Sequence, residues 1–321
     1  MIITVLEGSS PDLVSPPFAA YAQRMRTPVT EFGPRRDWLA REGGRLVGTA
    51  SVVYPDRENL DYSLVNVRVL PESRRSGIAS ALLSEIVPEL RDRGRTIVWG
   101  QAQSGTGVQE WAEALGFATV SQSAQMTLTI DTVDPQLWQV PTAEGFRLEQ
   151  WIDTAPEKLV AAYAAARTAI TDAPDGDRGP ENPEWTADRV REHERAAQAS
   201  SLLCRVVVAV DKATGTIASL TEARVAAGSR QICHQGDTAV LAGFRGHGLG
   251  LCIKAAMMRW LTAEEPELRQ IITDTAADNT HMIRVNRQLG YVLTHVMVDF
   301  ETDTEALATR LEDRDPGRYT Q

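Results

Sequence analysis

The sequence predicts an α/β (α+β) chain that contains two copies of one fold. Each copy is a mixed, mostly antiparallel sheet flanked by helices. Two observations predict this arrangement. The same order of strands and helices can be assigned to both halves of the 321 residues. A glycine-containing turn that joins a strand to a helix also occurs at matching places in both halves. A repeat of this size indicates two domains in tandem rather than a solenoid of short repeats.

The first half begins with a strand, followed by a helix, a hairpin and a strand that alternates valine with polar residues. A turn then leads into a helix with apolar residues at helical spacing, and a strand, a helix and a last strand follow. These elements are assigned to Ile2–Leu6, Pro17–Met25, Trp38–Arg41, Arg45–Tyr54, Leu64–Leu70, the helix through Ile78, Leu82, Ile86 and Leu90, and Thr96–Gln101, Val108–Leu115 and Gln125–Ile130.

The second half repeats this order, with two helices around a polar loop after its first strand. Its elements are assigned to Phe146–Trp151, Pro156–Thr168, Thr186–Ala199, Leu202–Asp211, Thr216–Arg224, Ile232–Val240, Gly248–Glu264, Ile271–Thr275, His281–Leu289 and Tyr291–Glu301. The seam is placed within Thr132–Glu144, where two prolines bracket a polar stretch. We therefore expect an N-terminal domain at 1–135, a C-terminal domain at 144–302 and a terminal helix or tail at 303–321.

The composition is that of a water-soluble globular protein, with 43% hydrophobic and 24% charged residues. No apolar stretch approaches the roughly 20 residues that span a bilayer, and Met1–Glu7 lacks the basic start of a signal peptide. The net charge of −10 disfavours nucleic acid, whose binding depends on Lys and Arg neutralising phosphates. We expect a cytoplasmic protein that binds neither membrane nor nucleic acid.

The cysteines and histidines do not predict a metal site. The three cysteines, Cys204, Cys233 and Cys252, have no metal-like spacing, and the five histidines form no ligand pair. An odd number of cysteines also fits a reducing compartment better than a disulfide-bonded protein.

The most informative segments are the two turns between strand and helix. They read Arg74-Arg75-Ser76-Gly77-Ile78-Ala79 and, after a strand that ends at Val240, Arg245-Gly246-His247-Gly248-Leu249-Gly250. Small residues let the backbone approach a ligand, and the free N–H groups of a first helical turn favour a pyrophosphate. A dinucleotide-binding fingerprint and a P-loop both fail on spacing and context. The remaining alternative is that the glycines serve only tight packing.

Both turns fill the pattern Arg/Gln-x-x-Gly-x-Gly/Ala, and each half also has a helix that ends in Leu-Gly-aromatic, at Leu115-Gly116-Phe117 and Leu289-Gly290-Tyr291. In these two features the chain resembles the GNAT superfamily of acetyltransferases over nearly its whole length. The resemblance implies two tandem GNAT folds, acetyl-CoA (CoA) as cofactor, its pyrophosphate on the turns and its pantetheine between two splayed strands. It also implies a place for Asn279 near the pantetheine, although Asn279 suits a helix N-cap equally well.

Members of the superfamily commonly place a tyrosine acid four residues before the glycine of Leu-Gly-aromatic. This chain has Ala112 and Asn286 there. Asn286 can hydrogen-bond a thiol sulfur but is not an acid, so the usual acid is in doubt. Tyr291 occupies the place of Phe117 and is assigned to packing.

For the general base, the strand Ile232–Val240 offers His234 and Asp237. Strand alternation places them on opposite faces, so both can face a ligand only if the strand bulges, and Gly236 would tolerate a bulge. The matching strand of the first half offers weaker candidates, which favours catalysis in the second half. The alternative for His234 is a partly buried histidine without a catalytic role.

These features together predict an acetyl-CoA-dependent N-acetyltransferase that acts on the amine of a small molecule, possibly a cationic one. Acidic residues between Asp172 and Glu184 would attract a cation, although a solvated loop explains them as well. One alternative is a non-catalytic acyl-CoA-binding or scaffold protein, and a second is an aminoacyl-tRNA-dependent transferase. The sequence leaves open whether the chain is a monomer or a homodimer, and whether the acyl group is larger than acetyl.

Overall fold

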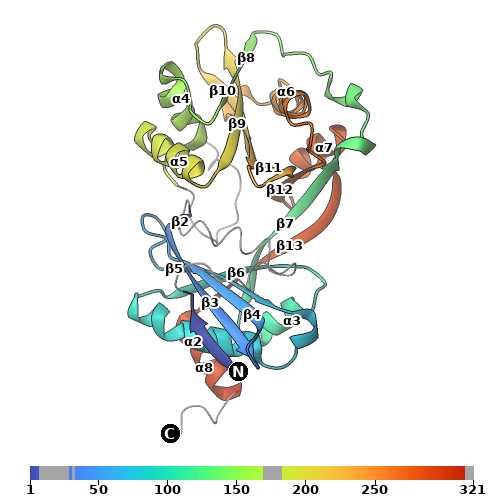
Figure 1. The fold of residues 1–321 in the computed structure, drawn as a ribbon. Coiled ribbons are helices and arrows are strands. Elements are labelled where there is room, and N and C mark those ends of the chain that lie inside the picture. Colours follow the sequence, from blue (N-terminus) through green and yellow to red (C-terminus); the bar gives the residue numbers. More distant parts are fainter. Residues whose placement is uncertain (7–28, 31–32, 169–182, 315–321) are drawn as a thin grey trace. The chain divides into compact units, whose positions relative to one another are not determined.

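The computed structural model describes residues 1–6, 29–30, 33–168 and 183–314, and their contacts divide into two compact units (Figure 1). The first unit consists of the described residues up to Ser121 together with those from Val298 onward. The second unit consists of the described residues from Gln122 to Met297. Two strands, β7 (Ala118–Thr129) and β13 (Val292–Asp303), therefore contribute residues to both units.

The first unit is built on strands in the order β1–β3–β4–β5–β6, with β2 paired to β3 and the end of β13 beside β6. Neighbouring strands are antiparallel except β5 and β6, which are parallel. The bounds are β1 Ile2–Val5, β2 Val29–Thr30, β3 Gly33–Glu42, β4 Arg45–Val53, β5 Tyr62–Val69 and β6 Ile97–Gln103, with helices α2 Ile78–Asp92, α3 Val108–Ala114 and α8 Thr304–Arg314.

The core of the first unit lies under α2 and α8. The apolar spacing that predicted α2 buries Ile78, Leu82, Ile86 and Leu90. The helix α8 adds Leu307, Ala308 and Leu311 to the same cluster. Residues expected to form a terminal helix or tail at 303–321 thus include a helix that completes the first unit, because its apolar stripe needs a partner to be buried.

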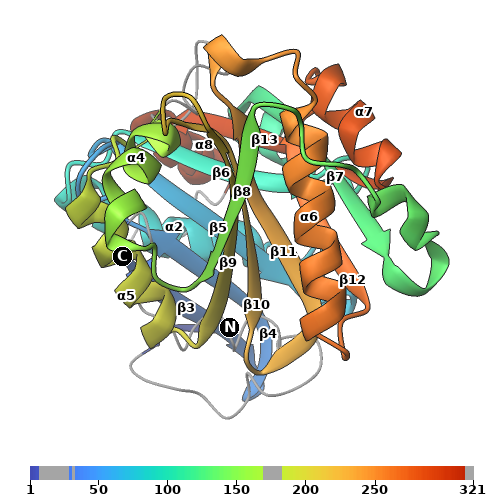
Figure 2. The same ribbon diagram turned by 90° about the horizontal axis from the view of Figure 1, so that it is seen from above.

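The second unit has the strand order β7–β12–β11–β10–β9–β8, and its pairs are antiparallel except β11 and β12. The bounds are β8 Phe146–Ile152, β9 Leu202–Asp211, β10 Ile217–Ala226, β11 Ser229–Val240 and β12 Gln270–Ala276, with helices α4 Glu157–Thr168, α5 Ala187–Ala199, α6 Leu249–Glu264 and α7 Thr280–Gln288. In Figure 2, α4 and α5 cover one face of this sheet and α6 covers the other.

Each face of this sheet has its own apolar core. Valines at 206, 208 and 210 of β9 pack with α4 and α5, whereas Val207 and Ala209 pack with α6. This alternation follows from the period of two along a strand. A strand covered on both faces is apolar throughout, which explains the run of valines in β9.

The segment Thr132–Glu144, expected to be the seam, packs within the second unit. Trp138 is only 3% exposed, and its indole N–H donates to the carbonyl of Leu289 at 3.0 Å. Arg259 of α6 donates to the carbonyl of Trp138 in turn. These two bonds join the segment to α6 and to the end of α7, and the division between the units falls before it, at Ser121/Gln122.

Two further sequence-based expectations, one helix and one strand, remain to be compared with the structure. The helix expected at Pro17–Met25 lies outside the described residues. The strand expected at Gln125–Ile130 begins earlier, at Ala118. The sequence did not predict this first part, because it is largely exposed and carries no apolar pattern. Within the described ranges, no helix is both long and apolar enough to cross a bilayer.

Candidate active site

Both glycine-containing turns have the geometry of an anion cradle at a helix start. Each follows a short 3₁₀ turn, Pro71–Ser73 or Ala242–Phe244, and leads directly into α2 or α6. Gly77 (φ +79°) and Gly248 (φ +70°) are the N-cap residues, and within the described residues no side chain caps either helix. The N–H groups of both first turns are therefore available to a ligand.

The backbone around these glycines is open and alike in the two units. Arg75 has φ +66° where Gly246 has φ +85°. A Cβ atom added at Gly77, Gly246 or Gly248 would meet no atom within 4 Å. The free space, the free N–H groups and the neighbouring arginines fit a pyrophosphate.

An arginine holds each turn against the strand before it. Arg74 Nε donates to the carbonyl of Val69 at 3.4 Å, and Arg245 Nε donates to that of Val240 at the same distance. These two equivalent bonds align the units residue by residue through the strand, the turn and the helix that follows.

Parallel pairing stops partway along the strand before each turn. The last pair of β5 and β6 is Leu64 with Trp99, and the last pair of β11 and β12 is Gln235 with Thr273. Five residues then run on, to Val69 or Val240, without a pairing strand on that side among the described residues. Each unit thus has an unpaired strand end that leads to its cradle, as a ligand lying between splayed strands requires.

The strand β11 contains a bulge that β5 lacks. On β10, Thr221 pairs with Thr238 while Ala223 pairs with Gln235, so one extra residue lies on β11 around Gly236. In the first unit, β4 and β5 keep one unbroken register from Gly48/Val69 to Val53/Leu64. The strand thus bulges at Gly236, the position that the sequence marked as able to tolerate a bulge.

The bulge brings His234 and Asp237 to the same face of the sheet. Asp237 pairs with Arg167 of α4 at 3.2 Å, which places it on the α4/α5 face. His234 lies opposite Arg224, which contacts His193 of α5 on that face. Both predicted residues are exposed, and the Asp237 side chain retains 48% of its accessible surface. They are accessible to an acceptor molecule.

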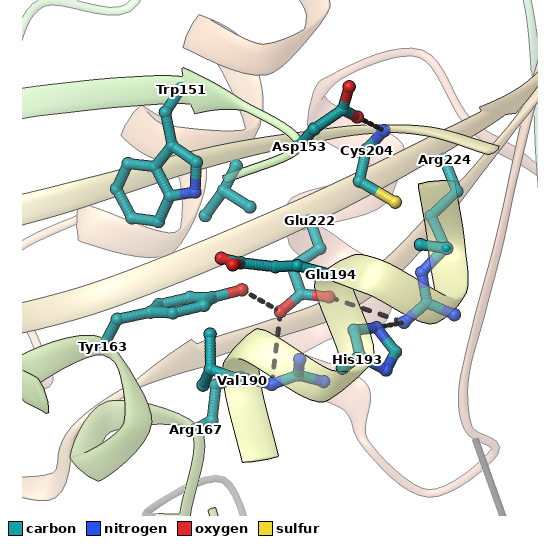
Figure 3. A pocket seen from close by; sticks show the side chains of 12 residues that line it. Trp151, Asp153, Tyr163, Arg167, Val190, His193, Glu194, Cys204, Glu222 and Arg224 are labelled. Atoms are coloured by element: carbon teal, nitrogen blue, oxygen red, sulfur yellow. Dashed lines mark hydrogen bonds and ion pairs between the residues drawn. The ribbon is translucent and has the colours of Figure 1, made fainter. Parts of the chain in front are cut away.

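Next to Asp237 lies a buried charged network centred on Glu222 of β10. Tyr163 donates to its carboxylate at 2.5 Å, and Arg167 and Arg224 approach it at 3.3 and 3.6 Å. Figure 3 shows these side chains converging from α4 and the sheet, with His193 beside Arg224. The guanidinium of Arg167 also stacks on Trp185, 3.4 Å from the ring centroid.

The network is held in its charged form. Burial opposes ionisation of Glu222, but Arg167 and Arg224 outweigh it and keep the pKa of that carboxyl below its usual range. Burial, with the nearby Glu222 carboxylate, raises the pKa of Tyr163 well above 10. The enclosed cavity among these residues has a volume of about 20 Å³, room for about one water. The network therefore supports the site rather than forming the acceptor pocket.

A second set of buried polar groups lies on the opposite face, under α6. The hydroxyl of Tyr291 donates to Gln235 Oε1 at 2.7 Å. Gln235 Nε2 donates to Thr221 at 3.0 Å, and the hydroxyls of Thr221 and Thr238 are 2.8 Å apart. Gln235 and Thr238 lie on either side of the extra residue. This chain of hydrogen bonds therefore spans the bulge and stabilises it on the α6 face of the sheet.

The first unit has only apolar residues at the same positions. Matched through the strand pairs, the two turns and the Leu-Gly-aromatic glycines, the polar residues Gln235, Thr221, Thr238, Lys254 and Tyr291 take the places of Val65, Ala50, Val67, Leu83 and Phe117. An apolar set satisfies the packing of this fold in the first unit. Because buried polar groups cost free energy unless they are paired, their concentration in the second unit indicates a functional requirement there.

The two predicted asparagines occupy different environments. Asn279 caps α7, and its side-chain oxygen accepts from the N–H of Met282 at 3.0 Å. Asn286 is fully buried, and its amide donates to the sulfur of Met126 at 3.6 Å. Its Oδ1 has no hydrogen-bond partner among the described residues, which leaves one buried acceptor open to a ligand.

The comparisons with known proteins agree with this geometry. The model of the acetyltransferase (GNAT) family matches residues 9–117, in the first half of the chain. A tandem GNAT protein from the clavulanic acid biosynthesis pathway, solved without AcCoA, superposes with a TM-score of 0.75 at 24% identity; the match covers 94% of this chain and 99% of that one. Residues 9–117 thus match the GNAT family, and the chain as a whole has a tandem GNAT fold.

Other solved structures share this fold. A GCN5-related N-acetyltransferase from Sphaerobacter thermophilus has a TM-score of 0.65 at 18% identity, over 84% of this chain and 80% of that one. A GNAT-family acetyltransferase from Colwellia psychrerythraea has a TM-score of 0.53 at 13% identity, over 94% and 99%. No curated protein matches the chain in sequence. The predicted fold class is confirmed.

Several residues of the candidate site were not predicted from the sequence. These are Tyr163, Arg167, His193, Glu222 and Arg224. One signal was present, since Glu222 is a charged residue inside an otherwise apolar strand. The acidic segment expected to attract a cation lies outside the described residues except for its end at Glu184. Within the described part of the chain, no group of acidic, histidine or cysteine side chains could hold a metal ion.

Proposed function

We propose that this acyltransferase transfers acetyl from acetyl-CoA to the amine of a small molecule, and that the second unit performs the transfer. The observation that carries the proposal is the bulge in β11, which has no counterpart in β5 and which brings His234 and Asp237 to one face. The family model matches the first half only, so the argument for the second unit rests on its geometry.

The cradle of the second unit would hold acetyl-CoA. Val240 ends the unpaired strand, the backbone from Arg245 to Gly250 would bind the pyrophosphate, and Asn279 caps the neighbouring helix. When bound, acetyl-CoA supplies an acyl group activated as a thioester. The first unit carries the same cradle at Arg74–Ala79, so it would bind CoA in a structural role.

His234 and Asp237 would act on the acceptor amine. An alkylamine with a pKa near 10 must lose a proton before it can attack, and a histidine has a suitable pKa to accept one. Asp237 is engaged by Arg167, so we assign it to attracting a cationic amine rather than to taking its proton. The extra residue of the bulge also leaves a backbone N–H outside the ladder, where it can stabilise an oxyanion.

The test is release of free thiol from acetyl-CoA in the presence of a panel of cationic amines, such as agmatine, spermidine and kanamycin. We expect wild-type turnover with at least one of them. His234→Gln should lower kcat by about 10²-fold or more, the range typical of a lost general base. Asp237→Asn should raise KM for a cationic amine, whereas Asp211→Asn, at the end of β9, should change neither constant.

Acetyl-CoA binding, measured by calorimetry, is the control for every variant. Loss of turnover with binding intact supports the catalytic assignment. If His234→Gln transfers acetyl as fast as wild type, the base is another group. Tight binding without turnover on any amine would favour the alternative of an acyl-CoA-binding scaffold, which the absence of tyrosine at Ala112 and Asn286 suggests.

A further inference from the structure

Lys254, in the middle of α6, is a buried amine that has no role in the reaction proposed above. The chain has three lysines, and whereas Lys158 and Lys212 are exposed, Lys254 is only 1% exposed. The matching residue of the first unit is Leu83, also buried. Packing at this place therefore does not need a lysine, and its presence in the second unit alone calls for a chemical reason.

The position of Lys254 on its helix directs it toward the unpaired end of β11. One turn before it, a Cβ at Gly250 would lie 3.6 Å from the side chain of Val240. One turn after it, the sulfur of Met258 is 3.6 Å from the hydroxyl of Tyr291, which itself bonds Gln235. Residues four apart share a helix face, so Lys254 lies at the level of β11 between Gln235 and Val240. This is the part of β11 beyond its last pair with β12.

The surroundings of the amine are apolar and aromatic. Its Nζ lies 5.4 Å from the centroid of the Tyr291 ring. Burial alone lowers the pKa of Lys254 from 10.5 to about 7. Tyr291 and Cys233 are the titratable groups that the elements packed on α6 bring to this level, and burial raises the pKa of both. At neutral pH they are uncharged, so among the residues that the structure describes no fixed counter-charge faces the Lys254 amine.

We propose, on the basis of the function proposed above, that Lys254 faces the sulfur of the acyl-CoA arm in the second unit and protonates it during acyl transfer. As the amine nitrogen of the acceptor forms its bond to the acyl carbon, the carbon–sulfur bond breaks and its electron pair stays on sulfur. Lys254 then gives one N–H proton to form S–H and regains a proton from solvent. The proton lost by the acceptor amine goes to the base.

The chemistry of the neighbouring residues fits this role. A thiol has a pKa of about 8.5, so an ammonium that titrates near 7 transfers its proton to a thiolate downhill. Asn286 stands where the family commonly has a tyrosine acid, and it has no proton of suitable acidity. Lys254 thus supplies, from α6, the acid that α7 does not provide.

The first experiment is an NMR titration of protein labelled with ¹³C at the lysine Cε. Three lysines give three signals, and Lys254→Met assigns the one from Lys254; the fold should tolerate this variant because Leu83 is apolar. The titration is run on the free protein, with CoA, and with desulfo-CoA, which lacks only the sulfur. We expect the Lys254 signal to titrate differently with CoA than with desulfo-CoA, and to show a further step above pH ~8.5 with CoA alone, because an amine and an adjacent thiol titrate as a coupled pair.

Three results would overturn the proposal. If CoA binds by calorimetry but Lys254 titrates alike with CoA and desulfo-CoA, the amine does not face the sulfur and only this inference fails. If wild type does not bind CoA, the proposed function fails with it. If mass spectrometry finds Lys254 acetylated after incubation with acetyl-CoA, the residue accepts the acyl group. In its support, Lys254→Met should bind CoA normally and release thiol about 10²-fold more slowly.

Discussion

Replacing Lys254 by leucine, the residue that the first unit has at this place, should remove a pH-dependent loss of stability. The native amine has a pKa of about 7, against 10.5 for the ordinary side chain. The unfolded chain therefore binds one more proton than the native protein between these two pH values. Unfolding takes up that proton, so the stability of the wild type falls as the pH falls from about 10.5 to 7.

The size of the effect follows from the shift. Each pKa unit corresponds to about 1.4 kcal/mol, so a shift from 10.5 to about 7 amounts to roughly 5 kcal/mol at neutral pH. The leucine variant has no group that titrates here. Relative to wild type it should gain about 1.4 kcal/mol in free energy of unfolding for each unit by which the pH is lowered from 10 to 7.

The assay is urea denaturation of wild type and Lys254→Leu at several pH values between 7 and 10. The free energy of unfolding is compared for the unfolding transition whose midpoint the substitution changes. The comparison cancels the titration of all other groups, which both proteins share. Lys212→Leu, which removes an exposed lysine, is the matched control and should show no such slope. A constant difference between wild type and Lys254→Leu across this range would show that the native amine stays charged, and would refute the reasoning.

Two other substitutions test the packing of the second unit. Glu222→Gln should lower the free energy of unfolding by about 3 kcal/mol or more in urea denaturation at neutral pH, because Arg167 would lose its buried counter-ion; a loss below about 1 kcal/mol would contradict this. Gly290→Ala should cost about 1–3 kcal/mol more than Gly116→Ala, since both glycines have positive φ but only at Gly290 would a Cβ approach Val133, at 2.6 Å. Equal thermal melting shifts for the two alanine variants would rule out the clash.

The sequence predicted the fold through features that act locally. The glycines at Gly77 and Gly248 are required by a left-handed backbone at a helix start, and such a requirement is visible in a sequence. The helix through Ile78 and Leu82 shows its buried face by spacing alone. The bulge at Gly236 was also predictable, because glycine in a strand with polar neighbours marks a place where the ladder is disturbed.

The remaining features depend on contacts between residues distant in sequence. Arg167 and Glu222 are 55 positions apart in the numbering, and neither has a local pattern that predicts the other. That α8 completes the first core also depends on a distant partner, α2. Lys254 lay inside an apolar helix pattern, where its burial became evident only once α6 was placed against β11.

The central claim is that the second unit binds acetyl-CoA for catalysis, and calorimetry on paired variants tests it most directly. Asparagine and aspartate both tolerate positive φ, so Gly248→Asn and Gly248→Asp differ mainly in the negative charge that aspartate brings to the pyrophosphate position. Gly77→Asn and Gly77→Asp form the same pair in the first unit. We predict that Gly248→Asp abolishes turnover and weakens binding while Gly248→Asn retains both, and that Gly77→Asp leaves turnover intact. Turnover lost in Gly77→Asp and kept in Gly248→Asp would contradict the claim and assign catalysis to the first unit.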